Sequence, residues 1–312
     1  MTDQQPLWAV MGPTATGKSA LAMALCHKVG GEIITVDSAQ VFKGLDVGTA
    51  KPNAAEQAQV RHHLIDLIDP GTQWSAADFV RAADAAIKDV RARGRVPILC
   101  GGTGLWMRAL VRGIFEAPDI DPELRQQIRD DLIKRGPEAV HAELALVDPE
   151  AAARIETRDP QRIGRALEVY RQTGTPISQL QAAHRFQERR YNLIGVALEW
   201  PREVLWQRIE ARTAQMFEGG IVAEAEAALA QGVASDGPGL SIIGYRDAVQ
   251  LLQGNIEAPE ALRRTTVATR RYAKRQRNWF NHEPDITWID AQTPVQAVLD
   301  GLEARSRPES AG

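Results

Sequence analysis

Eight residues near the N-terminus have the types and spacing of a phosphate-binding loop, because they read G-x-x-x-x-G-K-S. They are Gly12, Pro13, Thr14, Ala15, Thr16, Gly17, Lys18 and Ser19. The glycines let backbone N–H groups curl around anionic oxygens, Lys18 adds a full positive charge, and the Ser19 hydroxyl could ligate Mg2+. The motif predicts that phosphates bind here, but it does not say whether they belong to ATP, to GTP or to another compound.

Two further groups that could do chemistry stand at the ends of apolar runs. The carboxylate of Asp37 could act as a general base, ligate Mg2+, or cap a helix that Ser38 begins. Residues 101–104, which read G-G-T-G, could form only a tight turn. They could also approach a phosphate, with the Thr103 hydroxyl donating to an oxygen.

The segment 263–279 carries the clearest signal for nucleic acid, since it holds basic residues and no acidic one. The basic residues are Arg263, Arg264, Arg270, Arg271, Lys274, Arg275 and Arg277. On a helix they would fall within an arc of roughly 160°, opposite a mostly apolar side. This pattern favours contact with a nucleic-acid backbone or a polyphosphate, although a run of charges is usually a solvated face. Two other pairs with helical spacing, Arg162 with Arg165 and Arg208 with Arg212, could be surface ion pairs.

The elements that must position these groups alternate between strands and helices. Strands are expected at residues 7–11, 32–37, 63–68 and 96–100, and helices at 19–29 and 75–94. This alternation is typical of an α/β fold, a parallel sheet with helices on both faces, as in P-loop NTPases. Ligands bind at the carboxyl ends of parallel strands, so the phosphate-binding loop, Asp37 and Thr103 should converge on one crevice.

Between about residues 118 and 190 the strand signal disappears and helix starts follow one another. Asp121, Asp148 and Asp159 each precede a proline, which places a capping acid before a proline at the first helical position. A strand at 192–198 then returns the chain to the sheet. The predicted domains are a P-loop-like core, residues 1–117 and 191–312, which includes the basic helix, and an all-helical insertion, residues 118–190.

Composition excludes several classes of protein. Charged residues make up 25% and apolar residues 44% of the chain, as in an ordinary globular protein, and the apolar runs are too short to span a membrane. Residues 1–6 show no signal peptide, so a cytoplasmic location is expected. Cys26 and Cys100 lie far apart and indicate neither a disulfide framework nor a zinc site. The net charge of −3 means that any affinity for nucleic acid must come from local patches.

Three functions remain open on the residues alone. One is a small-molecule kinase with Asp37 as the base towards an acceptor hydroxyl, and another is an enzyme that holds a pyrophosphate leaving group and acts on nucleic acid. The third is a non-catalytic, nucleotide-dependent switch that binds RNA. The sequence argues against an ATPase, because no second apolar run ends clearly in an acid of the kind found in P-loop ATPases. Asp66 and Asp69 are the only nearby candidates, and both are ambiguous.

Several motifs, taken in order, resemble those of one family, the tRNA dimethylallyltransferases. They are GPTATGKS at 12–19, VDSAQ at 36–40, GTAKP at 48–52, GGTG at 101–104, DPQRIGRALE at 159–168, IGYR at 243–246 and ATRRYAKRQ at 268–276. The resemblance covers essentially the whole chain. It implies transfer of a dimethylallyl group from dimethylallyl diphosphate to N6 of the adenosine on the 3′ side of the anticodon, in tRNAs that read codons beginning with U.

The resemblance also implies roles for the residues described above. The phosphate-binding loop would hold the pyrophosphate of the prenyl donor instead of ATP. Lys18, Arg212 and a Mg2+ ion on Ser19 would neutralise the leaving pyrophosphate. Asp37 would accept a proton from the adenine amino group, with Thr103 at the reaction centre. The adenosine must leave its stack to reach these groups, so base flipping is expected.

The same resemblance implies that a monomeric enzyme binds the anticodon stem-loop through both domains. The residues expected to contact tRNA are Asp37, Ser38, Ala39, Gln40, Thr103, Arg125, Gln161, Arg162, Ile163, Gly164, Arg165, Arg246, Arg270, Arg271, Lys274 and Arg275. Two departures from the family pattern stand out. Trp106 replaces a usual Tyr and could reshape the prenyl pocket, and residues 155–159 read I-E-T-R-D where the family usually has His-Pro-Asn-Asp.

Overall fold

The computed structural model describes residues 3–113, 120–184 and 189–307. The chain divides into two compact units, each with its own internal packing. The sheet unit consists of residues 1–111 and 189–312, and the helical unit consists of residues 112–188. No helix in the described part of the chain is long and apolar enough to cross a membrane.

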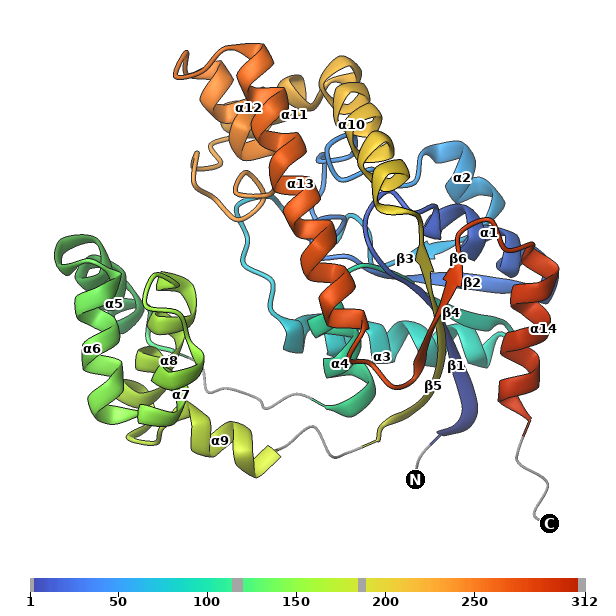
Figure 1. Ribbon diagram of the computed structural model, residues 1–312, viewed down its shortest axis with the longest axis horizontal. Helices are drawn as coiled ribbons and strands as arrows, with labels where there is room; N and C mark the ends of the chain where they lie inside the picture. The colour runs from blue at the N-terminus through green and yellow to red at the C-terminus, as the bar shows by residue number, and fades with distance from the viewer. Residues whose placement is uncertain (1–2, 114–119, 185–188, 308–312) are drawn as a thin grey trace. The chain divides into compact units, whose positions relative to one another are not determined.

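Within the described residues, the sheet unit contains six parallel strands in the order β3-β2-β4-β1-β5-β6 (Figure 1). Their bounds are β1 Asp3–Met11, β2 Gly31–Val36, β3 His62–His63, β4 Val96–Gly101, β5 Tyr191–Glu199 and β6 Ile286–Asp290. Strands β2, β4 and β5 are buried along most of their length, because helices cover both faces of a parallel sheet. The predicted fold class is confirmed.

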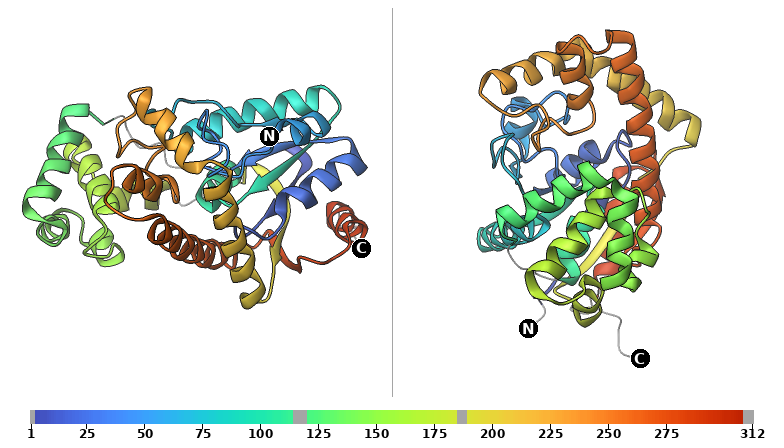
Figure 2. Two further views of the ribbon diagram at one scale, coloured as in Figure 1. Left: turned by 90° about the horizontal axis from the view of Figure 1, so that it is seen from above. Right: turned by 90° about the vertical axis from the view of Figure 1, so that its left-hand side faces the viewer.

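The helices of the sheet unit are α1 Lys18–Val29, α2 Ala54–Gln59, α3 Ala76–Ala92, α4 Gly104–Arg112, α10 Arg202–Gly219, α11 Ile221–Ala230, α12 Tyr245–Leu252, α13 Ala258–Phe280 and α14 Val295–Ser306. Helices α1, α3 and α14 pack on strands of the sheet, whereas α10, α11, α12 and α13 pack against one another. Leu25 of α1 and Leu302 of α14 share one core cluster with Val10 of β1. Figure 2 shows α3 on the other side of the sheet. Helix α13 spans 23 residues and packs against α10 and α12.

The strand expected at residues 63–68 is wrong, because β3 contains only His62 and His63. Leu64 and Asp66 have positive φ angles of 65° and 54°, so the chain turns instead of extending. The Asp66 carboxylate pairs with the Lys51 ammonium at 2.5 Å. Asp66, one of the two candidates for a second acid beside the phosphate-binding loop, therefore serves to join two loops of the chain.

No helix begins at Ser38, which corrects one of the interpretations of Asp37. Residues 38–41 form turns, and an Asp37 carboxylate oxygen accepts the Ala39 N–H at 2.9 Å. A short aspartate side chain can cap a turn in this way as readily as it caps a helix. The Gln40 N–H, in the same turn, also acts on the carboxylate and lowers the pKa of Asp37.

The helical unit is built from short helices, several of which begin with a capping Asp followed by a Pro. They are α5 Pro122–Arg135, α6 Pro137–Val147, α7 Pro149–Arg154, α8 Pro160–Thr173 and α9 Ile177–His184. The carboxylates of Asp121, Asp148 and Asp159 each accept a backbone N–H in the first turn of α5, α7 and α8, at 2.8, 2.9 and 3.0 Å. This unit has a core of its own, formed by Ile128, Val140, Leu144, Ala152, Ile163, Ala166 and Leu167.

The turn between β4 and α4 needs its glycines for packing. A Cβ atom on Gly101 would lie 2.0 Å from the carbonyl oxygen of the last residue of β2. A Cβ on Gly102 would lie 2.0 Å from the Gln276 side-chain nitrogen, and one on Gly104 would lie 2.1 Å from the Trp279 ring. These contacts explain the glycines of the G-G-T-G motif by close approach to β2 and α13.

We expect Gly101→Ala to lower the free energy of unfolding by about 1–3 kcal/mol, because the backbone of β2 cannot move away from the new methyl group. Urea unfolding followed by circular dichroism measures the change. Gly71→Ala is the matched control, since nothing lies within 4 Å of a Cβ at Gly71. It should change the stability by less than about 0.5 kcal/mol. Equal stability of both variants would contradict the packing explanation.

Candidate active site

The loop between β1 and α1 adopts conformations that L side chains seldom take. Gly12, Ala15 and Gly17 have φ angles of 125°, 64° and 96°. A Cβ on Gly12 would also lie 3.2 Å from the backbone N and O atoms of Leu198 in β5. Positive φ angles at these points curl the backbone, so that successive N–H groups can face one region.

The carbonyl oxygens of this loop are held by side chains from the segment that follows β5. The indole Nε1 of Trp200 donates to the Thr16 carbonyl at 3.1 Å, and Nε of Arg208 donates to the Ala15 carbonyl at 2.8 Å. The Arg208 guanidinium also lies over the Trp200 ring, 5.0 Å from its centroid. Arg208 therefore supports the loop backbone instead of forming the surface ion pair that its helical spacing suggested.

With these carbonyls held, the donors of the loop are left available for an anion. The N–H groups of residues 15–19 have no hydrogen-bond partner within the part of the chain that the structure describes. The Thr14 N–H differs, because it donates to Oε1 of Gln276 at 2.9 Å. The Lys18 ammonium donates to the Pro13 carbonyl at 2.6 Å, which holds it along the loop.

Lys18, Asp37 and Arg212 influence one another beside this loop. The pKa of Lys18 is lowered to about 8, chiefly by burial and also by the charge of Arg212, while Asp37 opposes the shift. Burial raises the pKa of Asp37 against the effects of the Ala39 N–H, Lys18 and Arg212, and it lowers the pKa of Arg212. A carboxylate with a raised pKa is a stronger base, and two cations nearby can stabilise developing negative charge.

Thr103 lies against the turn that follows Asp37. The Ser38 N–H donates to the Thr103 hydroxyl at 3.1 Å, and that hydroxyl lies 3.4 Å from the Ser38 hydroxyl. Burial and the charge of Asp37 raise the pKa of Tyr272 in α13, while the side chains of Thr103 and Gln276 act in the opposite direction. Tyr272, which the sequence places on the apolar side of its helix, thus joins Asp37 and Thr103 at the site.

Glu224 of α11 holds the loop that follows this turn. Its carboxylate accepts the three N–H groups of residues 46–48 at 2.8 to 3.4 Å, together with the Tyr245 hydroxyl. The Gln40 amide nitrogen donates to two carbonyls at the end of the same loop, at 3.2 and 3.1 Å. Sequence reasoning missed Glu224, because a lone glutamate on a helix is ordinary and its partners lie far away in the chain.

The cations of α13 divide into paired and unpaired groups. Four of them form ion pairs: Arg263 and Arg264 with Glu260, Arg270 with Glu210, and Arg277 with Glu199. Arg271, Lys274 and Arg275 are exposed and have no ion pair with any described residue. The acid-free segment 263–279 therefore does not mean an acid-free surface, since the pairing acids come from one turn upstream, from α10 and from β5.

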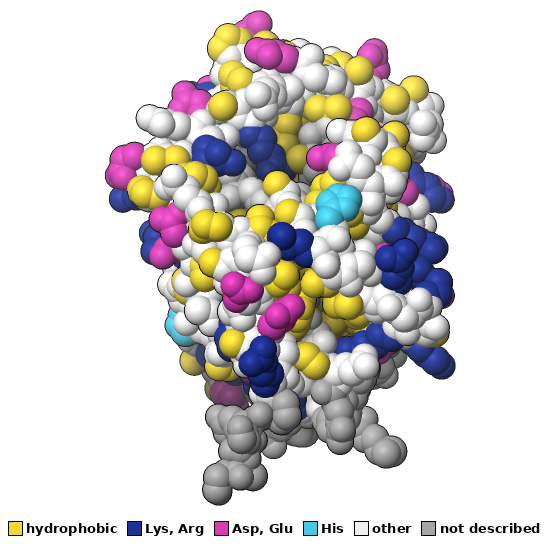
Figure 3. Space-filling view, turned by 90° about the vertical axis from the view of Figure 1, so that its right-hand side faces the viewer, with side chains coloured by type: hydrophobic (Ala, Val, Ile, Leu, Met, Phe, Trp, Pro, Cys, Tyr) yellow, Lys and Arg dark blue, Asp and Glu magenta, His cyan; other side chains and the backbone are white. Residues whose placement is uncertain are grey.

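Surface charge elsewhere is also mixed. On the face drawn in Figure 3, many Lys and Arg side chains gather towards one edge, while acidic and apolar side chains occupy much of the rest. A phosphate backbone would therefore meet a small set of unpaired cations instead of a uniformly basic surface. Arg246 of α12 is a further exposed cation without an ion pair among the described residues.

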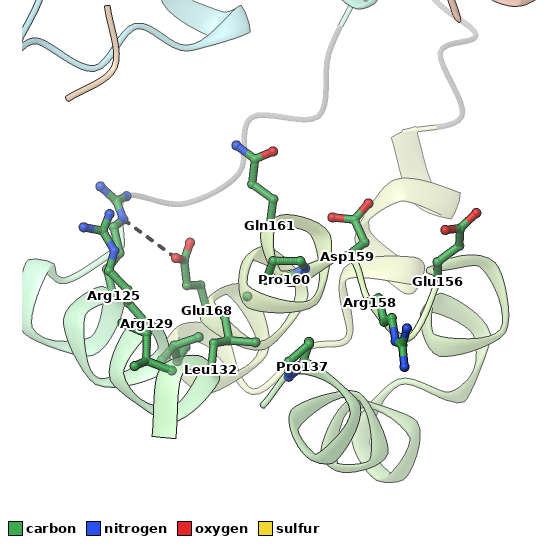
Figure 4. Close-up of a pocket in the computed structure, with 13 residues that line it drawn as sticks. Arg125, Arg129, Leu132, Pro137, Glu156, Arg158, Asp159, Pro160, Gln161 and Glu168 are labelled. Atoms are coloured by element: carbon green, nitrogen blue, oxygen red, sulfur yellow. Dashed lines mark ion pairs between the residues drawn. The ribbon is translucent and has the colours of Figure 1, made fainter. Parts of the chain in front are cut away.

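A groove on the helical unit collects several of the residues expected to contact tRNA. It is lined by Arg125, Ile128, Arg129, Leu132, Ile133, Pro137, Glu156, Arg158, Asp159, Pro160, Gln161, Gly164 and Glu168. Figure 4 shows Gln161, Asp159 and Glu156 projecting to the same side, with Arg125 directed towards Glu168. The Arg125–Glu168 contact is long, at 3.9 Å, so the guanidinium keeps donors for another partner.

The other residues of this unit that were expected to contact tRNA differ in how accessible their side chains are. Ile163 is fully buried in the core of the helical unit, so its side chain cannot touch RNA. Arg162 is exposed and pairs with Asp159 at 3.5 Å, and the half-buried Arg165 pairs with Glu168 at 3.1 Å. The 3.6-residue period of α8 explains the difference, because it buries Ile163 on one face and leaves Arg162 on the other.

Two further expectations concern Trp106 and a metal ion. Trp106 is 5% exposed and stacks on Phe79 of α3, with ring centroids 4.6 Å apart, so it packs between two helices. Among the described residues, no group of three His, Cys, Asp or Glu side chains could hold a metal ion. A divalent cation beside the exposed Ser19 would have to take most of its ligands from a bound phosphate and from water.

Comparison with known proteins identifies relatives over nearly the whole chain. A family model described as IPP transferase matches residues 40–283. The tRNA dimethylallyltransferase of Anaeromyxobacter dehalogenans (strain 2CP-C) is 49% identical over 95% of this chain and 98% of its own. The tRNA dimethylallyltransferase of Myxococcus xanthus is 45% identical over 95% of this chain and 96% of its own.

Solved structures agree with these matches. A full-length tRNA isopentenylpyrophosphate transferase from Bacillus halodurans is 36% identical, with a TM-score of 0.68 over 97% of this chain and 98% of its own. A eukaryotic dimethylallyltransferase acting on tRNA is 25% identical, with a TM-score of 0.81 over 97% of this chain and 80% of its own.

The lowered pKa of Lys18 predicts how anion binding depends on pH. Below a pKa of about 8 Lys18 is an ammonium, and above it the charge is lost, so the affinity for inorganic pyrophosphate should fall as the pH rises from 7 to 9. Isothermal titration calorimetry measures this affinity. Lys18→Arg, whose guanidinium stays charged, is the control for ionisation of the ligand itself and should lose less affinity. The same loss in both proteins would exclude titration of Lys18 as the cause.

Proposed function

Because this chain belongs to the IPP transferase family, we propose that it transfers a dimethylallyl group from dimethylallyl diphosphate to N6 of the adenosine on the 3′ side of the tRNA anticodon. The tRNAs are those that read codons beginning with U. The observation that carries this proposal is the pairing of an anion-binding loop, whose N–H groups are available, with a base of raised pKa flanked by two cations. The protein acts as a monomer in the cytoplasm.

The loop and Lys18 bind the diphosphate of the donor. The N–H groups of residues 15–19 face the anion, and Lys18 and Arg212 offset the charge that develops on the diphosphate as it leaves. The donor's C1–O bond breaks and a bond forms between C1 and N6 of adenine, so the products are modified tRNA and diphosphate. No phosphoryl group is transferred, and the loop therefore needs no second acid to position water.

Asp37 takes the proton that N6 loses. Its raised pKa supports this role. The contact of the Ser38 N–H with the Thr103 hydroxyl supports an acceptor position beside these two residues. Thr103 orients the adenine. Mg2+ would be held by the Ser19 hydroxyl and would supply further neutralisation of the diphosphate.

The tRNA is bound by both units. The exposed cations Arg271, Lys274 and Arg275 of α13 contact phosphates, and Arg125 and Gln161 line the groove of the helical unit. The kinase and the nucleotide switch are not supported, since the matched relatives are tRNA-modifying transferases along nearly their full length.

Label transfer from radioactive dimethylallyl diphosphate to unmodified tRNA, with Mg2+ and without ATP, tests the reaction. We expect label in the tRNA, and none when the target adenosine is replaced by another nucleoside. Asp37→Asn should lower the turnover by at least about a hundredfold, because an amide cannot accept the proton, while tRNA affinity changes little. Full turnover in Asp37→Asn would remove Asp37 from the role of base, and no label with wild-type protein would contradict the transfer itself.

The difference between paired and unpaired cations predicts different salt dependence. Replacing Lys274 and Arg275 with Ala should weaken tRNA binding and lower the slope of log affinity against log salt by about 1–2, because two phosphate contacts are lost. The matched control replaces Arg263 and Arg264, which already pair with Glu260. That control should leave the slope almost unchanged. Filter binding at several salt concentrations measures the affinity and the slope of both variants. Equal slopes would show that Lys274 and Arg275 face only solvent and do not contact phosphates.

A further inference from the structure

Gln276 is a buried polar side chain on the inner face of α13 that takes no direct part in the proposed transfer reaction. It is only 5% exposed. Its Oε1 accepts the Thr14 N–H at 2.9 Å, and its Nε2 donates to the Gly102 carbonyl at 3.0 Å. One amide thus joins the phosphate-binding loop, residues 12–19 and below called the diphosphate loop, to the turn that carries Thr103. Its oxygen accepts a hydrogen bond from the loop and its nitrogen donates one to the turn.

The surroundings of this amide are shaped to receive it. A Cβ atom on Gly102 would lie 2.0 Å from Nε2 of Gln276, so any other residue there would displace the amide. Three residues further along the same face of α13, the Trp279 ring occupies the space that a Cβ on Gly104 would need, at 2.1 Å. The inner face of α13 therefore rests directly on residues 102–104, with the amide reaching past them to the loop.

We propose that Gln276 is a positioning residue, whose amide fixes the diphosphate loop relative to the turn that carries Thr103. The inference rests on the proposed function, because it concerns the alignment of the prenyl donor with the adenine. Transfer between two bound molecules depends on holding the reacting atoms in place. Without the amide, the Thr14 N–H and the Gly102 carbonyl each lose a buried partner, and the loop and the turn are no longer joined.

Two substitutions test whether Gln276 acts through its hydrogen bonds or only fills space. Gln276→Met keeps a similar volume but can make neither hydrogen bond. Gln276→Glu keeps an acceptor for the Thr14 N–H, but it can donate to the Gly102 carbonyl only when its carboxyl is protonated. Gln253→Met, directly after α12, is the matched control, since Gln253 is exposed and its side chain bonds to those of Gln250 and Asn255, far from the site.

We expect Gln276→Met to weaken inorganic pyrophosphate binding and to lower kcat, each by roughly tenfold, because a buried neutral hydrogen bond is lost at each end. The tRNA affinity should stay unchanged, since the side chain lies on the inner face of α13. In Gln276→Glu the pyrophosphate affinity, relative to wild type, should recover as the pH falls and the carboxyl becomes a donor. Gln253→Met should match wild type throughout. Calorimetry, steady-state label transfer and filter binding measure these quantities.

Wild-type pyrophosphate affinity and kcat in Gln276→Met would overturn the positioning role and leave the transfer reaction standing. If wild-type protein transferred no label, the transfer reaction would fail, while pyrophosphate binding would still decide whether the amide positions the loop. If Gln276→Met did not fold, Gln276→Glu would decide, and an affinity ratio that did not change with pH would overturn the assignment. Repulsion between the carboxylate of Gln276→Glu and pyrophosphate would also weaken binding at high pH. It cannot explain the whole expected result, because Gln276→Met carries no charge and should be impaired as well.

Discussion

A backbone can present several N–H groups to an anion only if the carbonyl oxygens between them face away from it. In this protein the carbonyls of Ala15 and Thr16 are held by Arg208 and Trp200, which follow β5 in the chain. The diphosphate loop is therefore organised by a strand and helix nearly two hundred residues away. The order β4-β1-β5 in the sheet makes this possible, because it places β5 directly beside β1.

Helix α13 carries the second constraint, since its two faces make different kinds of contact. Its inner face touches the diphosphate loop and the turn with Thr103 through Gln276, and its outer face exposes Arg271, Lys274 and Arg275. A helix of 23 residues thus places these exposed cations at a fixed offset from the phosphate-binding loop, as the proposed function requires. The close approach at Gly102 and Gly104 is what lets this helix lie so near the reaction centre.

The sequence was sufficient where function follows from local spacing. The loop at residues 12–19 and the strand-end position of Asp37 could be recognised because strand, turn and helix are adjacent in the chain. It was insufficient where a role arises from a distant partner. Trp200, Glu224 and Gln276 are ordinary residue types, and their partners lie 184, 177 and 262 positions away.

Two misjudged features have the same physical origin. The strand expected at residues 63–68 looked apolar and extended, but positive φ angles at Leu64 and Asp66 are set by the packing of their loop. The basic stripe of α13 looked unpaired because Glu199 and Glu210 stand on other elements. The helical unit was easier to anticipate, since each Asp-Pro start is a local signal that the structure realises as a capped helix.

The proposed function requires one crevice of the sheet unit to hold both the diphosphate of a prenyl donor and the target adenine. A crystal structure with an unreactive analogue of dimethylallyl diphosphate and an anticodon stem-loop tests this requirement. We expect diphosphate oxygens on the N–H groups of residues 15–19, with adenine N6 about 2.6–3.2 Å from the Asp37 carboxylate. A diphosphate bound away from residues 15–19, or an adenine that stays stacked in the RNA and out of reach of Asp37, would contradict it.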